Sequence, residues 1–229
     1  MTAPTSFWGL LVSSFIVAVG TFVLLLFISA PYGRHARSGW GPTLNNRLGW
    51  VLMEAPAALA MAVCLLAGTQ PRTPTRLVLF ALWELHYVYR AFIYPFRLRS
   101  DARRMPLVIP LMGLGFNAFN ASLNGYHLFA LSDLYTVAWL GDARFLAGGL
   151  LFLGGLLINR SADATLRRLR APGEHGYRIP YGGLYRWVSC PNYLGEITQW
   201  MGWALATWSL PGLAFAVWTA ANLAPRART

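Results

Sequence analysis

The sequence predicts an all-α, polytopic membrane protein with about seven transmembrane helices. Of its 229 residues 56% are hydrophobic, and the mean hydropathy is +0.44. Charged residues make up only 12% of the chain, whereas a soluble domain carries about 25%. The apolar residues also gather in runs close to the ~20 residues that a helix needs to cross a bilayer. We therefore expect one integral membrane domain over residues 1–229, embedded in the lipid bilayer.

The apolar runs place the spans in chain order. They cover residues 7–30, 48–68, 76–96, 106–130, 143–160, 193–209 and 210–224. Only the short segment Ser209–Gly212 divides the last two runs, so their boundary is the least marked. We find no internal repeat and no low-complexity segment.

All 19 basic residues are arginine, and they give the chain a net charge of +11. Most follow the first, third and fifth spans or lie in the tail, and few lie in the alternate loops. The positive-inside rule then predicts an outside N-terminus and a cytoplasmic C-terminus. The use of arginine alone favours a bacterial inner membrane. Membrane spans interrupt the basic residues, which argues against nucleic acid as a partner. A guanidinium also pairs well with phosphate, so the late arginines are consistent with a phosphate ligand as well as with topology.

Ionisable residues inside the second and third spans indicate a polar interior. Glu54 lies in the second span, two residues before Pro56, and a carboxylate at that depth is costly and usually functional. Burial favours a protonated form that could donate a hydrogen bond, although a structural bond to a neighbouring helix is the alternative. In the third span Glu84, Tyr87 and Tyr94 share one helical face, and Arg90 flanks it.

Amides mark the next two spans. Asn117, Asn120 and Asn124 form one ridge on the fourth span, which fits either interhelical hydrogen bonding or a cavity lining. Asn159 and Asp163 lie one turn apart where the fifth span ends, before a basic extension. The two cysteines, Cys64 and Cys190, have neither metal-site spacing nor a disulfide pattern, and we expect no metal.

The stretch from Tyr177 to Trp200 is too polar for lipid. Gly182-Gly183 permits a tight turn, and the residues around Pro191 predict the start of a helix. That helix carries Asn192, Glu196 and Gln199 on one face. A polar stripe on a membrane helix has to face protein, water or ligand, and never lipid tails.

This stretch and several others resemble the steroid 5α-reductases. The resemblance is carried by Tyr177–Ser189 (YRIPYGGLYRWVS), Asn192–Glu196 (NYLGE), Trp203–Pro211 (WALATWSLP), Glu54-Ala-Pro56, His86-Tyr87 with Arg90, and Tyr32–His35. It implies NADPH-dependent reduction of the 4,5 double bond of a 3-oxo-4-ene steroid, with hydride going to carbon 5. Negative charge then develops on the ketone oxygen, which Tyr87 and Glu54 polarise, either by sharing a proton or with Glu54 orienting Tyr87.

The resemblance also implies a cavity with two sets of contacts. Cofactor contacts, in and around a cytoplasmic loop at about 160–191, are expected from Tyr94, Arg99, Arg103, Asn159, Asp163, Arg167, Arg170, Tyr177, Arg178, Asn192, Glu196, Asn222 and Arg226. Substrate contacts are expected from Tyr32, Met53, Phe116 and Trp200, although vertebrate members carry Gln where this chain has Met53.

Other functions remain open at this point. A membrane methyltransferase of the isoprenylcysteine type shares a Pro-x-Tyr-x-Gly stretch, here Pro191–Gly195, but normally has Arg-His before it, where this chain has Ser189-Cys190. A transporter would explain Glu54 and Arg90 and leave the late stretch unexplained, and a reductase of another enone lipid is also consistent. No Gly-x-Gly-x-x-Gly follows a strand pattern, so a soluble dinucleotide-binding domain is not expected. We expect a monomer.

Overall fold

Helices dominate the chain. The computed structural model describes residues 3–28, 39–98, 104–169 and 178–228, and in these ranges nearly every element is helical, in agreement with the predicted all-α class. The chain forms two compact units, one of Met1–Phe7 with Ala30–Leu140 and one of Trp8–Ser29 with Gly141–Thr229. The expectation of a single membrane domain stays a prediction.

The first unit is built around α2 and α5. Its elements are β1 (Thr43–Asn45), α2 (Asn46–Ala67), α3 (Pro74–Val88), η2 (Tyr89–Ile93), α4 (Tyr94–Arg97), β2 (Arg104–Pro106), α5 (Val108–Tyr126), η3 (His127–Leu131) and η4 (Val137–Gly141). Gly113 of α5 lies against Met53 of α2, and Gly125 lies against Cys64. The two helices therefore run parallel, so they begin at the same end of the unit.

A short antiparallel sheet, which the sequence does not predict, joins the segments before α2 and α5. Thr43 pairs with Pro106 and Asn45 with Arg104, and the Arg104 guanidinium donates to the Thr43 hydroxyl at 2.8 Å. Asn45 then caps α2 by accepting from the backbone N–H of Arg47 at 2.8 Å. The sheet therefore fixes the start of α2 beside the segment that leads into α5.

The predicted third helix is interrupted by a π-helical turn. A continuous helix was expected over 76–96, but η2 spans Tyr89–Ile93 between α3 and α4. A π-helical turn inserts one extra residue, so it rotates everything after it around the axis. The face that Glu84, Tyr87 and Tyr94 would share on a regular helix is therefore interrupted at η2.

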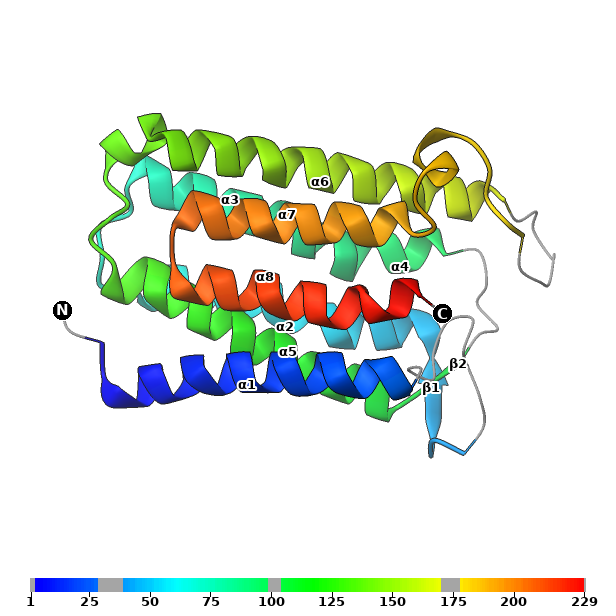
Figure 1. The fold of residues 1–229 in the computed structure, drawn as a ribbon. Coiled ribbons are helices and arrows are strands. Elements are labelled where there is room, and N and C mark those ends of the chain that lie inside the picture. The colour runs from blue at the N-terminus through cyan, green and yellow to red at the C-terminus, as the bar shows by residue number, and fades with distance from the viewer. Residues whose placement is uncertain (1–2, 29–38, 99–103, 170–177, 229) are drawn as a thin grey trace. The chain divides into compact units, whose positions relative to one another are not determined.

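The second unit is built around the pair α6 and α7. It contains most of α1 (Thr5–Phe27), together with α6 (Ala143–Arg168), η5 (Gly183–Arg186), α7 (Pro191–Thr207), α8 (Leu210–Leu223) and η6 (Pro225–Ala227). α6 and α7 lie side by side along their length (Figure 1), with Gly148 against Ala206 and Gly155 against Gln199, which makes them antiparallel. Trp208 adopts a left-handed conformation with φ 46° and ends α7, and Ser209 caps α8.

In the part of the chain that the structure describes, three helices are long and apolar enough to cross a membrane. They are α1, α2 and α6, so the chain has the character of a membrane protein. α7 and α8 have 17 and 14 residues, fewer than a perpendicular span needs. The seven predicted runs all contain helix, but their number as membrane spans stays a prediction.

Candidate active site

A buried carboxylate is the centre of the polar cluster in the first unit. Glu54 lies in the middle of α2 and is only 7% exposed. Its Oε1 accepts from the Arg90 guanidinium at 3.4 Å, and its Oε2 accepts from the amide of Asn117 at 3.3 Å. Both oxygens act as acceptors in these bonds, as those of an ionised carboxylate do, and the protonated form that the sequence suggests stays a prediction.

Asn117 connects this carboxylate to Tyr87. The Tyr87 hydroxyl donates to Asn117 Oδ1 at 3.3 Å, while Asn117 Nδ2 also donates to the carbonyl oxygen of Met53 at 2.7 Å. Tyr87 is buried and packs against Trp83, with ring centroids 4.9 Å apart. Trp83 in turn donates to the carbonyl of Ala57 at 3.1 Å, which holds α3 on α2. Glu54, Asn117 and Tyr87 thus form one hydrogen-bonded row contributed by three helices.

Aromatic rings hold the arginine that pairs with Glu54. The Arg90 guanidinium lies 4.7 Å from the ring centroid of Trp50 and 5.2 Å from that of Tyr94. The two rings meet edge to face at 5.2 Å. Arg90 lies in the π-helical turn, and its guanidinium reaches the Glu54 carboxylate of α2. A cation held between rings can neutralise Glu54 while remaining largely out of water.

The second unit has a separate polar site where α6 and α7 meet. Asn159 of α6 is buried, and its amide donates to the carbonyl oxygen of Asn192 at 2.9 Å and to the Glu196 carboxylate at 3.4 Å. Gln199, one turn further along α7, is completely buried. The predicted polar stripe of α7 therefore faces α6 and not lipid, as expected. The predicted helix start is also confirmed, because Pro191 is the first residue of α7.

The segment before α7 turns back over the end of α6. Gly182 and Gly183 have φ values of 86° and 52°, which lie in the left-handed region that glycine adopts readily, and they form a turn of the kind that the sequence permits. The Tyr185 hydroxyl donates to the carbonyl oxygen of Ala162 at 3.2 Å. Burial raises the pKa of Tyr185 well above its usual range, and the nearby Asp163 and Cys190 add to the shift. Tyr185 therefore stays a neutral donor over a wide pH range.

The groups available in this unit suit a dinucleotide with phosphates. Buried Asn159 and Asp163 offer amide and carboxylate groups, which match hydroxyl and carboxamide partners. Arg226 lies in η6 with its guanidinium 5.6 Å from the Tyr193 ring centroid, and Arg178 is exposed at the start of the returning segment. Guanidinium groups match phosphate oxygens.

Comparison with known proteins decides the family. The profile of the family described as 3-oxo-5-alpha-steroid 4-dehydrogenase matches residues 103–229. Steroid 5-alpha-reductase DET2 of Gossypium hirsutum is 41% identical over 227 residues, covering 98% of this chain and 88% of its own. The chain belongs to the 3-oxo-5-alpha-steroid 4-dehydrogenase family. The resemblance predicted from single segments is confirmed over nearly the whole chain.

Mammalian members of the family are equally similar. The bovine 3-oxo-5-alpha-steroid 4-dehydrogenase 1 is 41% identical, covering 93% of this chain and 83% of its own. The human 3-oxo-5-alpha-steroid 4-dehydrogenase 2 is also 41% identical, covering 94% of this chain and 85% of its own. These matches include the helices that carry Glu54 and Tyr87, and they decide against the membrane methyltransferase and the transporter as alternatives.

The remaining predicted residues lie in varied surroundings. Met53 packs its side chain over Gly113, and Phe116 is half-buried on α5 beside Asn117. Trp200 is 1% exposed in an aromatic cluster, with its ring centroid 4.2 Å from that of Phe215 and 5.7 Å from that of Phe152. Asn222 is half-buried on α8, one turn before Arg226. Their roles as substrate or cofactor contacts stay predictions.

Five predicted residues lie outside the described residues, and two further residues of the site were not predicted. Those outside the described residues are Tyr32, Arg99, Arg103, Arg170 and Tyr177. The missed residues are Asn117 and Arg90, which bond directly to Glu54. The sequence contains a signal for each of them: Asn117 opens the amide ridge and Arg90 follows Tyr87 by three residues. Neither signal alone indicates which of several polar neighbours makes the contact.

Proposed function

We propose that this protein reduces the 4,5 double bond of 3-oxo-4-ene steroids to give 5α-3-oxosteroids, with NADPH as the reductant. The observation that carries the proposal is the buried row of Glu54, Asn117 and Tyr87. A neutral hydroxyl in an apolar setting, aligned by a charged group, is suited to stabilise a developing oxyanion. The names of the relatives, which are steroid 5-alpha-reductases, supply the substrate class.

In this proposal Tyr87 donates to the ketone oxygen of the substrate. Hydride addition at carbon 5 moves an electron pair toward that oxygen, so a donor there lowers the energy of the transition state more than that of the ground state. Without substrate, the Tyr87 proton points to Asn117 Oδ1. The ketone oxygen then replaces Asn117 as acceptor. A proton from solvent ends on carbon 4, which balances the reduction.

Glu54 acts as a positioning residue in this scheme. Its carboxylate accepts from Asn117, so it fixes which way the Asn117 amide faces, with the oxygen toward Tyr87. Arg90 pairs with the same carboxylate. That pairing keeps the negative charge of Glu54 from opposing the charge that develops on the substrate. Of the two roles that the sequence leaves open, the hydrogen bonds favour the one in which Glu54 orients Tyr87.

The polar site of the second unit would hold the cofactor. Asn159, Asp163, Asn192 and Glu196 offer amide and carboxylate partners, and arginines such as Arg178 and Arg226 offer donors for phosphate. NADPH supplies the hydride when bound. The protein's own part is to bind NADPH, orient it and keep water away.

We further infer that the chain spans the membrane several times as a monomer, with its N-terminus outside and the 160–190 segment in the cytoplasm.

Replacing Tyr87 tests the reaction directly. Tyr87→Phe removes the donor and keeps the ring, and loss of one oxyanion donor costs about 100- to 1000-fold in turnover. The measurement is single-turnover NADPH oxidation with a 4-en-3-one steroid, with NADPH binding measured separately. Tyr126→Phe, at an exposed tyrosine of the same unit, is the matched control and keeps full activity. Reduction by Tyr87→Phe at the wild-type rate contradicts the assignment of Tyr87.

The same assay tests whether Glu54 and Tyr87 act together. Because Glu54 acts through Tyr87, the double variant Tyr87→Phe with Glu54→Gln loses little more turnover than the worse single variant.

A second experiment measures turnover with NADPH and with NADH at equal sub-saturating concentration. The late arginines predict faster turnover with NADPH, since an extra phosphate needs extra guanidinium donors. Equal turnover with the two cofactors excludes a role for these arginines in selecting the phosphate.

A further inference from the structure

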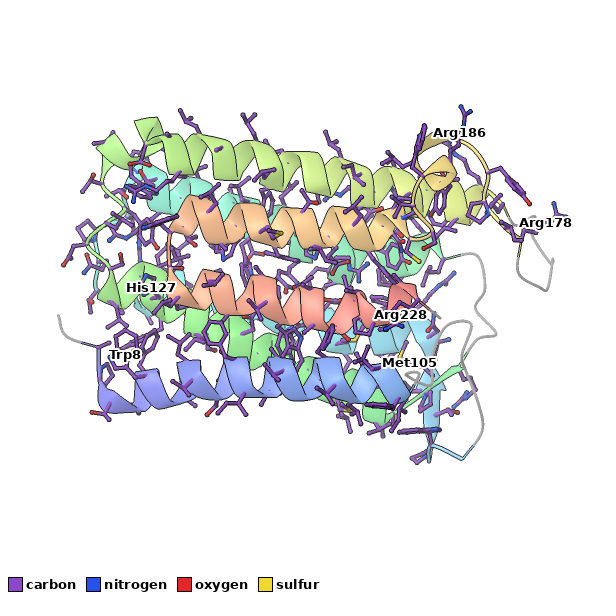
Figure 2. The ribbon with its side chains drawn as sticks, viewed as in Figure 1. Trp8, Met105, His127, Arg178, Arg186 and Arg228 are labelled. Atoms are coloured by element: carbon purple, nitrogen blue, oxygen red, sulfur yellow. The ribbon has the colours of Figure 1, made fainter. Side chains whose placement is uncertain are left out.

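The segment between α6 and α7 presents large apolar side chains outward. Ile179, Tyr181 and Trp187 are 71%, 82% and 83% exposed, and Leu184 is 41% exposed. Two arginines, Arg178 and Arg186, flank them in sequence and extend away from the ribbon in Figure 2. A segment that only linked two helices through water would carry polar side chains at such positions. These residues therefore indicate an interaction surface.

The surface is held in a defined position on α6. The η5 turn is closed by the backbone N–H of Tyr185 donating to Gly182 at 3.1 Å and that of Trp187 donating to Leu184 at 3.0 Å. The Tyr185 side chain ties this turn to the carbonyl of Ala162. Trp187 is therefore displayed by a structured turn whose level along α6 is fixed.

That level coincides with the edge of the hydrocarbon layer. α6 begins at Ala143, and Ala162 lies 19 residues further on, which corresponds to about 28 Å along the helix axis. The hydrocarbon core of a bilayer is about 30 Å thick. If α6 enters the core at its first turn, Ala162 lies where the helix leaves it. The remaining residues to Arg168 then reach through the headgroup layer.

The start of α7 agrees with this depth. The Asn192 carbonyl accepts from Asn159, which lies one turn before Asp163 on α6. The chain therefore enters the core just after Pro191, and the residues before it lie at the headgroup level. Tryptophan and tyrosine prefer this level, because their rings are apolar and their N–H and O–H groups find polar partners there. Arginine at the same level pairs with lipid phosphate.

We propose that Ile179, Tyr181 and Trp187, with Arg186, form a lipid-docking surface that inserts its side chains into the headgroup layer and prefers anionic phospholipid. The surface is distinct from the catalytic row of the first unit and does not depend on the proposed reaction. It seats the segment between α6 and α7 on the membrane. The bilayer therefore holds this segment in place together with the hydrogen bond from Tyr185 to Ala162 of α6.

The test measures the depth of spin labels along one unit. Single cysteines replace Trp187 and Tyr181 in a Cys64→Ser, Cys190→Ser background and carry a nitroxide. Nanodiscs contain phosphatidylcholine with phosphatidylglycerol, and accessibility to oxygen and to a nickel chelate is compared. Two sites calibrate the depth: Leu157, exposed on the apolar part of α6, and Arg168, exposed at its end. We expect the oxygen-to-nickel ratios at positions 187 and 181 to fall between those of positions 157 and 168.

Three outcomes overturn the proposal. If the label at position 187 has the same oxygen-to-nickel ratio as the label at position 168, the segment lies in water. A label shielded from both reagents means that protein, such as a second copy of the chain, covers it. A water-accessible label at Leu157 removes the premise that α6 crosses the bilayer and overturns the proposal as well.

A second measurement keeps Trp187 in place. The melting temperature of the wild type is expected to be higher in nanodiscs with phosphatidylglycerol than in phosphatidylcholine alone. The triple variant Ile179→Ser, Tyr181→Ser, Trp187→Ser and the separate variant Arg186→Gln each reduce that difference. Arg228→Gln, at an exposed arginine in the tail, is the matched control and leaves it unchanged. An equal difference in the triple variant and the wild type contradicts the proposal.

Discussion

The two units hold their helices together in opposite ways. In the first unit, polar side chains join the helices: Asn117 of α5 bonds to Met53 and Glu54 of α2 and to Tyr87 of α3. In the second unit, backbones meet directly, because Gly148, Gly155, Gly195 and Gly202 let α6 and α7 approach until no side chain separates them. The first unit uses the same residues for packing and for its chemistry. The second unit separates these roles, with glycines along the helix pair and polar groups at one end.

The spacing of the glycines explains the close contact in the second unit. Gly148 and Gly155 on α6 are seven residues apart, as are Gly195 and Gly202 on α7. Seven residues are two helical turns, so both glycines of a helix lie on one face. In membranes, where lipid is as apolar as the helices, such close packing is a main source of helix association. We therefore expect this pair to tolerate added atoms poorly.

Substituting Gly155 has a large expected effect on the stability of the second unit. A Cβ at Gly155 would lie 2.4 Å from the backbone nitrogen of Gln199 and 2.5 Å from the oxygen of Gly195, so the helices must move apart. Overpacking typically costs about 1–3 kcal/mol and occasionally more, and backbone contacts place Gly155→Ala at the upper end. The measurement is the apparent melting temperature in detergent. Gly154→Ala is the matched control, because a Cβ there has no neighbour within 4 Å. Equal melting temperatures for the two variants contradict this account of the helix pair.

The sequence predicts the second unit better than the first. The helix start at Pro191, the turn at Gly182-Gly183 and the inward polar stripe with Glu196 all follow from local rules, which need no knowledge of a partner helix. The paired glycines were not predicted, since which of the many glycines face another backbone depends on how the helices pair. Gly154 and Gly155 are adjacent in sequence, yet only Gly155 faces the backbone of α7.

In the first unit the sequence identifies polar residues but not their bonds. Glu54 and Tyr87 are predicted as a pair, yet the hydrogen bonds described between them run through Asn117. The amide ridge of α5 has three members at helical spacing, and only its position against α2 selects the first. The π-helical turn at Tyr89–Ile93 has no reliable local signature, and it decides where Arg90 and Tyr94 lie.

Substituting Asn117 tests whether packing and chemistry share residues in the first unit. Asn117→Ala leaves Tyr87 without this acceptor and Glu54 and the Met53 carbonyl without a donor, and each buried unsatisfied group costs about 1–3 kcal/mol. Stability and turnover should therefore fall together. Misplacement of Tyr87 should lower kcat by up to about 100-fold, with the KM for NADPH unchanged.

The control for Asn117 lies one turn along the same helix. Asn120 is equally buried, and its Nδ2 has no hydrogen-bond partner within the described part of the chain. Asn120→Ala should leave kcat near that of the wild type, because no hydrogen bond described for Asn120 reaches Glu54 or Tyr87. A similar loss of kcat in both variants indicates a general packing effect and removes the positioning role of Asn117.

Substituting Tyr185 gives the smallest effect and tests the separation of roles in the second unit. Tyr185→Phe removes the hydrogen bond to Ala162, worth about 1 kcal/mol, while the glycine contacts of α6 and α7 remain.

The effect of Tyr185→Phe on stability should depend on pH. A free tyrosine has a pKa of about 10, and the pKa of Tyr185 in the folded protein is raised, mainly by burial. An acid whose folded pKa is raised contributes stability below the unfolded pKa, and that contribution is lost as pH rises toward the folded pKa. The wild type should therefore be more stable than Tyr185→Phe at pH 8, and its advantage should shrink above about pH 10. Melting temperatures of both proteins at pH 8 and at several values above about pH 10 check this, with Tyr181→Phe, at an exposed tyrosine of the same segment, as the control. A difference that stays constant with pH would mean that Tyr185 ionises alike in the folded and unfolded chain, so burial at the end of α6 does not hold its proton.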